Sequence, residues 1–225
     1  MIYFFSGKPG NGKSLHMAEI MYYALRSGKN VIANFQIDEF SLYSEKRAYN
    51  YGWFVYEPNK YWLNNAYKNR TDNFSYLDGL YNFARLMHKK NNRGQIKESQ
   101  TLLVLDECQE LFNTRTWNRK DRLEWCSFFR QHRKYGFDVY LISQDDKVID
   151  KQIRNILEYE VEHRCVNNYK IFGKILGLLS GGKLFVAITR WYARAGHQDS
   201  FICSKYFVGK KKFYNFYNSY KVFDR

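Results

Sequence analysis

The residues with the clearest capacity for chemistry lie near the N-terminus, in the stretch Gly7-Lys8-Pro9-Gly10-Asn11-Gly12-Lys13-Ser14. This stretch fits the pattern G-x-x-x-x-G-K-S/T of a phosphate-binding loop. Glycines let such a loop turn without a Cβ clash, and its backbone amides face the β-phosphate of a nucleotide. Lys13 is expected to reach the β- and γ-phosphates, and the Ser14 hydroxyl to bind Mg²⁺. The predicted nucleotide-binding residues are Gly7, Lys8, Pro9, Gly10, Asn11, Gly12, Lys13, Ser14 and Leu15.

A loop of this kind needs a strand before it and a helix after it, and the sequence predicts both. Residues 1–5 form a short apolar run that is typical of a buried strand. Residues 15–25 place apolar side chains at helical spacing, and Gly28 provides a stop signal. The motif therefore stands in the strand–loop–helix setting that directs amides and the helix dipole towards a bound phosphate.

A second candidate site follows the apolar run at residues 101–105, which is typical of a central parallel strand buried on both faces. Asp106 and Glu107 come directly after this run, which gives it the Walker B pattern. Asp106 is expected to hold Mg²⁺ through its water shell, and Glu107 to orient or deprotonate the attacking water. An isolated acidic pair can instead cap the next helix from the surface. The phosphate-binding loop upstream favours the catalytic interpretation.

Three more residues are candidates for catalytic roles. Gln144 follows an apolar run, at the kind of strand end where ligands gather in open α/β sheets, and is expected to sense the γ-phosphate or the water. The alternative is an amide that caps Asp145 and Asp146. Arg130 and Arg133 stand at the end of a predicted helix. One of them could act on a neighbouring subunit as an arginine finger, or both could simply complement the helix dipole.

Strands and helices alternate over residues 1–156, which predicts an α/β fold of the P-loop NTPase type, with a mostly parallel sheet flanked by helices. The further expected elements are a strand at 30–35, a strand or hairpin at 49–56, a helix at 77–90, a helix at 119–135 and a strand at 137–144. Residues 36–100 are otherwise interpreted as a variable insertion with helical parts.

The pattern changes after residue 156. Residues 157–166 and 183–192 alternate between apolar and polar side chains, which predicts antiparallel strands with one solvated side. Four glycines between them are expected to supply turns: Gly173, Gly177, Gly181 and Gly182. We therefore predict a P-loop core at 1–156 and a β-rich, basic extension of the same domain at 157–225, which ends in a polar aromatic tail.

The positive charge is concentrated at the C-terminal end. The net charge is +14 overall, and residues 151–225 alone carry 14 Lys and Arg against 5 Asp and Glu. Such a basic third suggests a polyanionic partner, either nucleic acid or anionic lipid headgroups, although a solvated face with no partner remains an alternative.

The cysteines and the hydropathy pattern exclude several classes of protein. The four cysteines contain no C-x-x-C pair, which argues against structural zinc or a disulfide framework. No run of 18 apolar residues occurs, so we expect this chain itself to be soluble and to hold no transmembrane helix. The first predicted strand starts at Met1, which leaves no room for a signal peptide. His132 and His163 have no nucleophile at a recognisable spacing, so no hydrolytic triad is predicted.

Several stretches, in order along the chain, together resemble the zonular occludens toxin (Zot) family of P-loop ATPases, which includes the assembly ATPases of filamentous phages. Residues 36–100 contribute little to this resemblance, and the arginine-rich block with the Ser-Gln strand after it is its most specific part. The stretches are Ile2 to Ser14, Leu105-Asp106-Glu107-Cys108-Gln109, Arg130 to Asp138, Leu141-Ile142-Ser143-Gln144, Ile149-Asp150 with Ile153-Arg154, and Phe216-Tyr217-Asn218-Ser219-Tyr220.

The resemblance implies a fold similar to the FtsK/HerA group of DNA-pumping motors. It also implies ATP and Mg²⁺ as cofactors, a homo-oligomeric ring such as a hexamer, and a place on the cytoplasmic side of the host cell membrane. The implied activity is ATP hydrolysis that drives virion assembly and extrusion of phage DNA, with the host inner membrane or membrane assembly proteins as further partners. Two alternatives stay open: an ATPase that packages DNA into a preformed capsid, and a nucleotide-gated binding or effector protein with little turnover.

Overall fold

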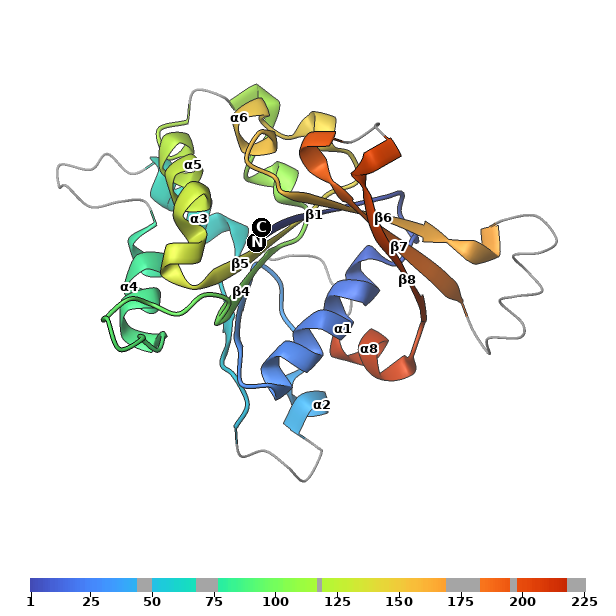
Figure 1. Cartoon of the computed structure of the whole chain (residues 1–225), viewed down its shortest axis with the longest axis horizontal. Coiled ribbons are helices and arrows are strands. Elements are labelled where there is room, and N and C mark those ends of the chain that lie inside the picture. Colours follow the sequence, from blue (N-terminus) through green and yellow to red (C-terminus); the bar gives the residue numbers. More distant parts are fainter. Residues whose placement is uncertain (44–49, 68–76, 117–118, 169–182, 195–197, 218–225) are drawn as a thin grey trace.

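The computed structural model describes residues 1–43, 50–67, 77–116, 119–168, 183–194 and 198–217, which form one eight-stranded sheet with helices on both faces (Figure 1). The strands are β1 (Ile2–Ser6), β2 (Asn30–Ala33), β3 (Phe54–Tyr56), β4 (Thr101–Leu105), β5 (Phe137–Ile142), β6 (Tyr159–Cys165), β7 (Leu184–Trp191) and β8 (Phe201–Val208). The helices are α1 (Lys13–Arg26), α2 (Glu39–Tyr43), α3 (Asn59–Tyr67), α4 (Asp78–Met87), α5 (Arg122–Gln131), α6 (Lys151–Arg154) and α8 (Lys211–Phe216).

The strand order across the sheet is β3-β2-β4-β5-β1-β6-β7-β8. All neighbours from β3 to β6 are parallel, whereas β7 runs antiparallel to β6 and β8 antiparallel to β7. The sheet is therefore mostly parallel with an antiparallel C-terminal edge, which confirms the predicted fold class.

Both faces of the central parallel strands are buried: alternate residues of a strand point to opposite sides, and each side is covered by helices. In β1, Phe4 joins a core with α3, α4, α5 and α6, while Phe5 joins a core with α1, α2 and α8. Figure 1 shows these two groups of helices on opposite sides of the strands. The continuous apolar runs in the sequence are thus explained by a three-layer arrangement, as expected for parallel strands.

Several elements differ from their predicted bounds. Residues 49–56 contribute a short strand, β3, which lies parallel to β2, so the hairpin interpretation is wrong for the described residues 50–56. The helix expected at 119–135 is α5 followed by a 3₁₀ turn at His132–Tyr135. The helix expected at 77–90 is α4, which ends at Met87. The strand expected at 137–144 ends at Ile142, so Gln144 stands beyond β5.

The C-terminal region contains one strand more than predicted. β6 and β7 pair antiparallel, as expected, but β6 also pairs in parallel with β1 and so continues the central sheet. β8 was not predicted because its side chains are exposed on both faces apart from Phe207 and the half-buried Val208, so it lacks a burial period. The glycines at 173–182 lie outside the described residues. Within the described part of the chain, every helix is too short or too polar to cross a membrane.

Candidate nucleotide site at the carboxyl edge of the sheet

The glycine-rich loop connects β1 to α1 at the sheet edge where the parallel strands end. Gly7, Gly10 and Gly12 have φ values of 132°, 78° and 90°, in a region that residues with a Cβ rarely adopt. At Gly7 a Cβ would also lie 2.6 Å from the carbonyl oxygen of His163 in β6. The loop therefore needs glycine both for its turn and for the close approach of β6.

The first turn of α1 offers a site for an anion. α1 begins at Lys13, directly after Gly12, so the amides of Lys13, Ser14 and Leu15 have no carbonyl partner within the helix. Such amides, together with the helix dipole, favour a bound phosphate. The loop and the start of α1 thus have the geometry that phosphate binding requires.

The Lys13 ammonium lies over the loop and close to the acidic residues. Its Nζ donates to the carbonyl oxygen of Gly7 at 2.6 Å. Burial lowers the pKa of Lys13, while the nearby charges of Asp106 and Glu107 act in the opposite direction. The structure therefore brings the lysine of the loop and the acidic pair after β4 into one electrostatic neighbourhood, although β5 separates β4 from β1.

A residue from the far end of the chain contacts Asp106 close to Ser14. The Tyr217 hydroxyl donates to Asp106 Oδ2 at 2.7 Å, and Ser14 is near enough to this phenol to lower its pKa, against the larger effect of burial. Asp106 is 6% exposed, and burial raises the pKa of its carboxyl, against hydrogen bonds from Tyr217 and the amide of Glu107. Burial and the neighbouring Asp106 raise the pKa of Tyr217, so the phenol stays protonated and donates.

These groups fit a magnesium ion in their chemistry. Mg²⁺ prefers oxygen ligands and is usually held by one or two carboxylates, hydroxyls and retained waters. Ser14 supplies a hydroxyl and Asp106 a carboxylate, and the Tyr217 phenol is hydrogen-bonded to Asp106 and lies close to Ser14. The two residues predicted to hold the metal are thus neighbours.

Asn34 fixes the backbone of Asp106. Its side chain, which follows β2 and is 1% exposed, donates from Nδ2 to the Asp106 carbonyl oxygen at 2.7 Å and to Asn59 Oδ1 at 2.8 Å. Its Oδ1 accepts from the Asp106 amide at 2.8 Å. Asn59 in turn donates to Glu110 at 2.8 Å. This buried network sets the direction in which the Asp106 carboxylate leaves β4.

Glu107 stands in a strained backbone conformation beside Asp106. Its φ is 47°, which is uncommon for a residue with a side chain. Its carboxylate accepts a hydrogen bond from Gln109, and its own amide donates to Asp106 Oδ1 at 2.8 Å. Because the backbone is left-handed at Glu107, the two acidic side chains point in different directions: Asp106 is buried, and Glu107 is half-exposed.

The other predicted catalytic residues lie in two different places. Gln144 is exposed, two residues beyond β5, at the same sheet edge as the loop, since β5 lies between β4 and β1. Arg130 is exposed in the last turn of α5, and Arg133 lies in the turn that leads into β5. Both arginines therefore lie at the opposite, amino edge of the sheet. A role on a neighbouring subunit remains a prediction for them.

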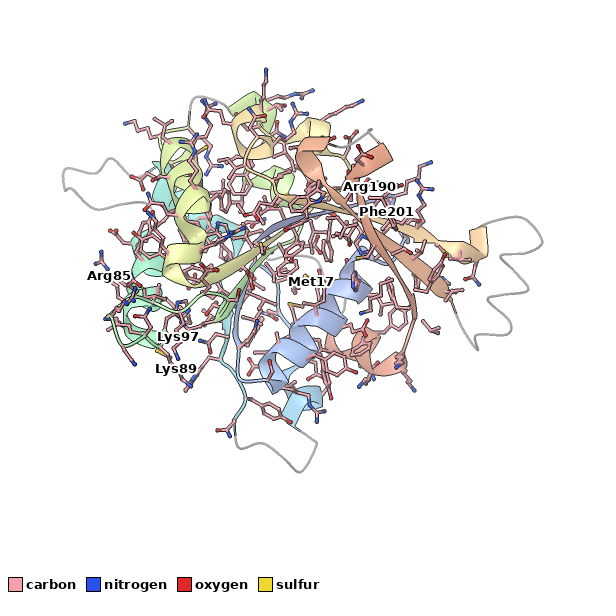
Figure 2. The ribbon with its side chains drawn as sticks, in the orientation of Figure 1. Met17, Arg85, Lys89, Lys97, Arg190 and Phe201 are labelled. Atoms are coloured by element: carbon pink, nitrogen blue, oxygen red, sulfur yellow. The ribbon has the colours of Figure 1, made fainter. Side chains whose placement is uncertain are left out.

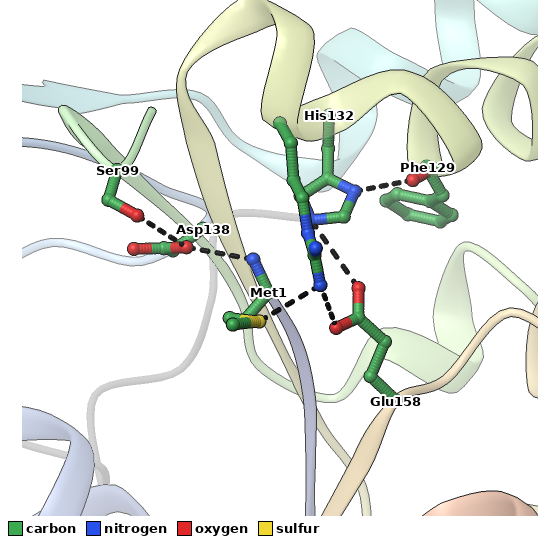
Figure 3. A network of polar contacts seen from close by, with 7 residues as sticks. Met1, Ser99, Phe129, His132, Asp138 and Glu158 are labelled. Carbon is green, nitrogen blue, oxygen red and sulfur yellow. Dashed lines mark hydrogen bonds and ion pairs between the residues drawn. The ribbon is translucent and has the colours of Figure 1, made fainter. Parts of the chain in front are cut away.

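Arg133 belongs to a polar network at that amino edge, and Figure 3 labels other members of this network, among them His132 and Glu158. Its guanidinium pairs with Glu158, which also lies 3.7 Å from His132 Nε2. The N-terminal ammonium of Met1 pairs with Asp138 at 2.8 Å. As an arginine finger, Arg133 would have to leave this ion pair.

Two buried histidines, His16 in α1 and His163 in β6, help to hold the backbone at the start of the loop. His163 Nδ1 lies 3.3 Å from the Ser6 carbonyl, which can only accept, so His163 donates there and its Nε2 accepts from His16 Nδ1 at 2.9 Å. Burial lowers the pKa of His16 to about 2 and that of His163 to about 4, so both rings are neutral. Asn11 donates to the His163 carbonyl at 2.9 Å and ties the loop to β6.

A hollow of about 330 Å³ opens between the loop and β6, lined by Gly7, Lys8, Asn11, Glu162, His163, Arg164 and Cys165. Its volume lies at the lower end of the range for small-molecule sites. Because residues of the loop line the hollow, a ligand whose phosphates bind the loop can place its remaining atoms in the hollow.

Sequence reasoning assigned no role to four of the residues described above. Asn34 had a weak signal, because it follows a strand at the functional edge of the sheet. His16 and His163 are 147 positions apart and have no local signal of contact. Tyr217 stood in a stretch that carried the family resemblance but was given no role.

Known proteins resemble this chain in sequence and in fold. A family model described as zonular occludens toxin (Zot) matches residues 1–176. The Gene 1 protein of Enterobacteria phage M13 is 31% identical over 142 residues, which are 60% of this chain and 40% of that protein. The Gene 1 protein of Salmonella phage IKe is 43% identical over 89 residues, which are 37% of this chain and 24% of that protein. The chain thus spans less than half the length of these relatives.

Among solved structures, the N-terminal domain of zonular occludens toxin from Neisseria meningitidis superposes with a TM-score of 0.51 at 17% identity. The superposition covers 96% of this chain and 97% of that one. At this level of identity the likeness concerns the fold alone.

Proposed function

Because the chain belongs to the zonular occludens toxin family, we propose that it is an Mg²⁺-dependent ATPase that drives phage virion assembly and extrusion of phage DNA. The observation that carries this proposal is the meeting of Lys13, Ser14 and Asp106 at one edge of the sheet. The relatives named Gene 1 protein belong to phages, which supports the assembly role.

Each residue has a defined role in this proposal. The loop amides and Lys13 bind the phosphates, and the hollow beside β6 takes the nucleoside. Ser14 and Asp106 would hold Mg²⁺, which supplies charge neutralisation between the β- and γ-phosphates when bound. Glu107 accepts a proton from the attacking water, and the side chain of Gln144 senses the γ-phosphate.

The proposal extends to the assembly in which the chain works. The ATPase acts as a homo-oligomeric ring, with Arg130 or Arg133 completing the site of a neighbouring subunit. It acts on phage DNA or a DNA–protein complex, at the cytoplasmic side of the host membrane and together with membrane assembly proteins. The family resemblance supports these partners.

The test separates nucleotide binding from turnover. We expect Lys13→Ala to abolish ATP binding, while Lys60→Ala, a change of an exposed lysine in α3, leaves it intact. We expect Glu107→Gln to bind ATP normally but not hydrolyse it, with Glu39→Gln, at an exposed position in α2, as the matched control. Binding is measured by titration with a fluorescent nucleotide, and turnover by phosphate release with and without single-stranded DNA.

Two outcomes would contradict the assignments. ATP binding that survives Lys13→Ala would remove the loop as the nucleotide site. Full hydrolysis by Glu107→Gln would show that another group activates the water. Tight binding with negligible turnover in the unchanged protein, with or without DNA, would instead favour a nucleotide-gated binding protein.

A further inference from the structure

The end of the described chain returns to the nucleotide site. α8 packs against α1, where Phe213 and Phe216 each lie with their ring 5.6 Å from that of Tyr22. The carbonyl of Phe216 accepts from the Asp38 amide at 2.9 Å. Tyr217 follows directly, with its ring 4.2 Å from that of Phe35 and its side chain among the buried residues. A short aromatic segment thus places one hydroxyl on the Asp106 carboxylate, close to Ser14.

We infer that the Tyr217 hydroxyl competes with Mg²⁺ for Ser14 and Asp106, so that loading of the metal–nucleotide complex releases the C-terminal segment from the site. This inference rests on the proposed function of the site. It makes α8 the element that reports nucleotide occupancy to the rest of an assembly.

The contacts of Asp106 and Ser14 carry the argument. Asp106 Oδ1 accepts from the Glu107 amide and Oδ2 accepts from Tyr217 at 2.7 Å, so both carboxylate oxygens are engaged. Ser14 lies close enough to the same phenol to act on its pKa. Mg²⁺ held by the Ser14 hydroxyl, and by Asp106 through water, would have to replace the phenol as the partner of these groups.

The way α8 is attached makes the release feasible. The helix has only six residues; within the described part of the chain it is held by aromatic contacts with α1, by packing against α2 and by the backbone hydrogen bond from Asp38. Lys212 adds a contact between its ammonium and the face of the Tyr22 ring, at 4.6 Å. These contacts are separate from the central sheet, so α8 can move without breaking strand pairing.

The test is a magnesium titration of nucleotide binding by the full chain. Tyr217→Phe removes the hydroxyl and keeps the ring, and Tyr214→Phe, on the same helix with its side chain 45% exposed, is the control. We expect Tyr217→Phe to lower the half-saturating Mg²⁺ concentration about tenfold, the usual effect of one hydrogen bond to a charged group. Nucleotide affinity without Mg²⁺ should stay the same, as should both values in Tyr214→Phe.

Hydrogen exchange gives a second measurement on the unchanged protein. Addition of Mg²⁺ with a non-hydrolysable ATP analogue should speed amide exchange in residues 211–217, and the analogue alone should not. An equal or higher magnesium requirement in Tyr217→Phe, or slower exchange in this segment, would overturn the inference and make Tyr217 a stabilising part of the metal site. Absence of any nucleotide binding by the unchanged protein would instead refute the proposed function.

A different observation points to a binding surface at the opposite edge of the sheet. Residues 85–97 carry five cations and no carboxylate, and within the described part of the chain none of these cations forms an ion pair: Arg85, Lys89, Lys90, Arg93 and Lys97. Figure 2 shows Arg85, Lys89 and Lys97 together at one side of the molecule. In the C-terminal third, by contrast, several of the described cations are paired with carboxylates, as Arg190 is with Glu162.

This basic segment is rigidly held. Gln100 accepts from the Lys89 amide at 2.8 Å and donates to the carbonyls of Lys89 and Lys97, at 3.0 and 2.8 Å. His88 bridges the Tyr135 carbonyl and the Thr101 hydroxyl. Beside the segment lies a hollow of about 660 Å³, whose lining includes Lys89, Lys97 and Trp53. The Trp53 side chain is 67% exposed.

The geometry points to this hollow as a binding site for single-stranded nucleic acid. Unpaired lysines fit the phosphates, and an exposed indole fits an unpaired base, which stacks on aromatic rings whatever its sequence. Duplex DNA keeps its bases stacked and would use the lysines only.

Fluorescence anisotropy with a labelled oligothymidine tests this site without nucleotide, and therefore independently of ATP hydrolysis. We expect Trp53→Ala to weaken binding by at least ~5-fold, as loss of one stacked base does. Lys89→Ala with Lys97→Ala should reduce the salt slope by about 0.7 per lost phosphate contact. Lys151→Ala with Lys210→Ala, two exposed lysines of the C-terminal third, is the control. Loss of binding in this control alone, or in none of the variants, would overturn the assignment.

Discussion

The contact between Asn34 and Asp106 makes a prediction that tests how the carboxylate of the site is held. Asn34→Ala removes one donor and one acceptor that serve the backbone of Asp106, at 2.7 and 2.8 Å. Asp106 is only 6% exposed, so its amide and its carbonyl both lose their partner away from bulk water. An unsatisfied buried group costs about 1–3 kcal/mol, so we expect a loss of about 3 kcal/mol in the free energy of unfolding.

The assay is urea unfolding followed by circular dichroism, with the slope m compared between variants to confirm that only stability has changed. Asn155→Ala, at an exposed position after α6, should stay within about 0.5 kcal/mol of the unchanged protein. Asn34→Ala should also weaken magnesium-dependent nucleotide binding, because the Asp106 carboxylate is no longer aimed. A loss of stability below about 0.5 kcal/mol would show that Asn34 does not fix this backbone.

Two further predictions concern acid pH and the arginines. Burial holds the pKa of His16 at about 2 and of His163 at about 4, below about 6.5 in the unfolded chain. As the pH is lowered, the unfolded state therefore takes up protons first. Between pH 6.5 and 4 the free energy of unfolding should fall by up to about 1.4 kcal/mol per pH unit for each ring. His16→Leu should reduce this slope in denaturation curves measured across the pH range, and an unchanged slope would exclude the histidine pair as its source. In mixtures of Glu107→Gln subunits with Arg130→Ala or Arg133→Ala subunits, phosphate release should partly recover, and no recovery in either mixture would count against an arginine acting in trans.

Local patterns were sufficient to predict the central elements. The run before Asp106 contains only residues that suit a strand buried on both faces, and β4 is such a strand. The loop motif predicted its own strand and helix, because its glycines are needed at positive φ, as observed at Gly10 and Gly12. These features depend on residues near one another in the sequence, so the chain itself specifies them.

Contacts between distant parts of the chain were not predictable. The hydrogen bond from Tyr217 to Asp106 joins residues 111 positions apart, and Asn34 and Asp106 are 72 positions apart. β8 escaped prediction because an edge strand exposed on both sides has no burial period. In each case the tertiary arrangement, rather than propensity, decides the structure.

The parallel sheet explains why local motifs nonetheless pointed to one site. Every parallel strand ends at the same edge, so residues that directly follow β1, β2, β4 and β5 must come together whatever their separation in sequence. Residues at the start of the strands gather at the other edge. There Met1, before β1, pairs with Asp138 in the neighbouring β5, and Arg133, before β5, pairs with Glu158, before β6, on the other side of β1. Tyr217 follows no parallel strand, and it reaches the functional edge only because α8 packs on α1, the helix that begins with the loop. The contact of Tyr217 with Asp106 therefore links the nucleotide site to the C-terminal segment, and it makes the position of α8 sensitive to what the loop binds.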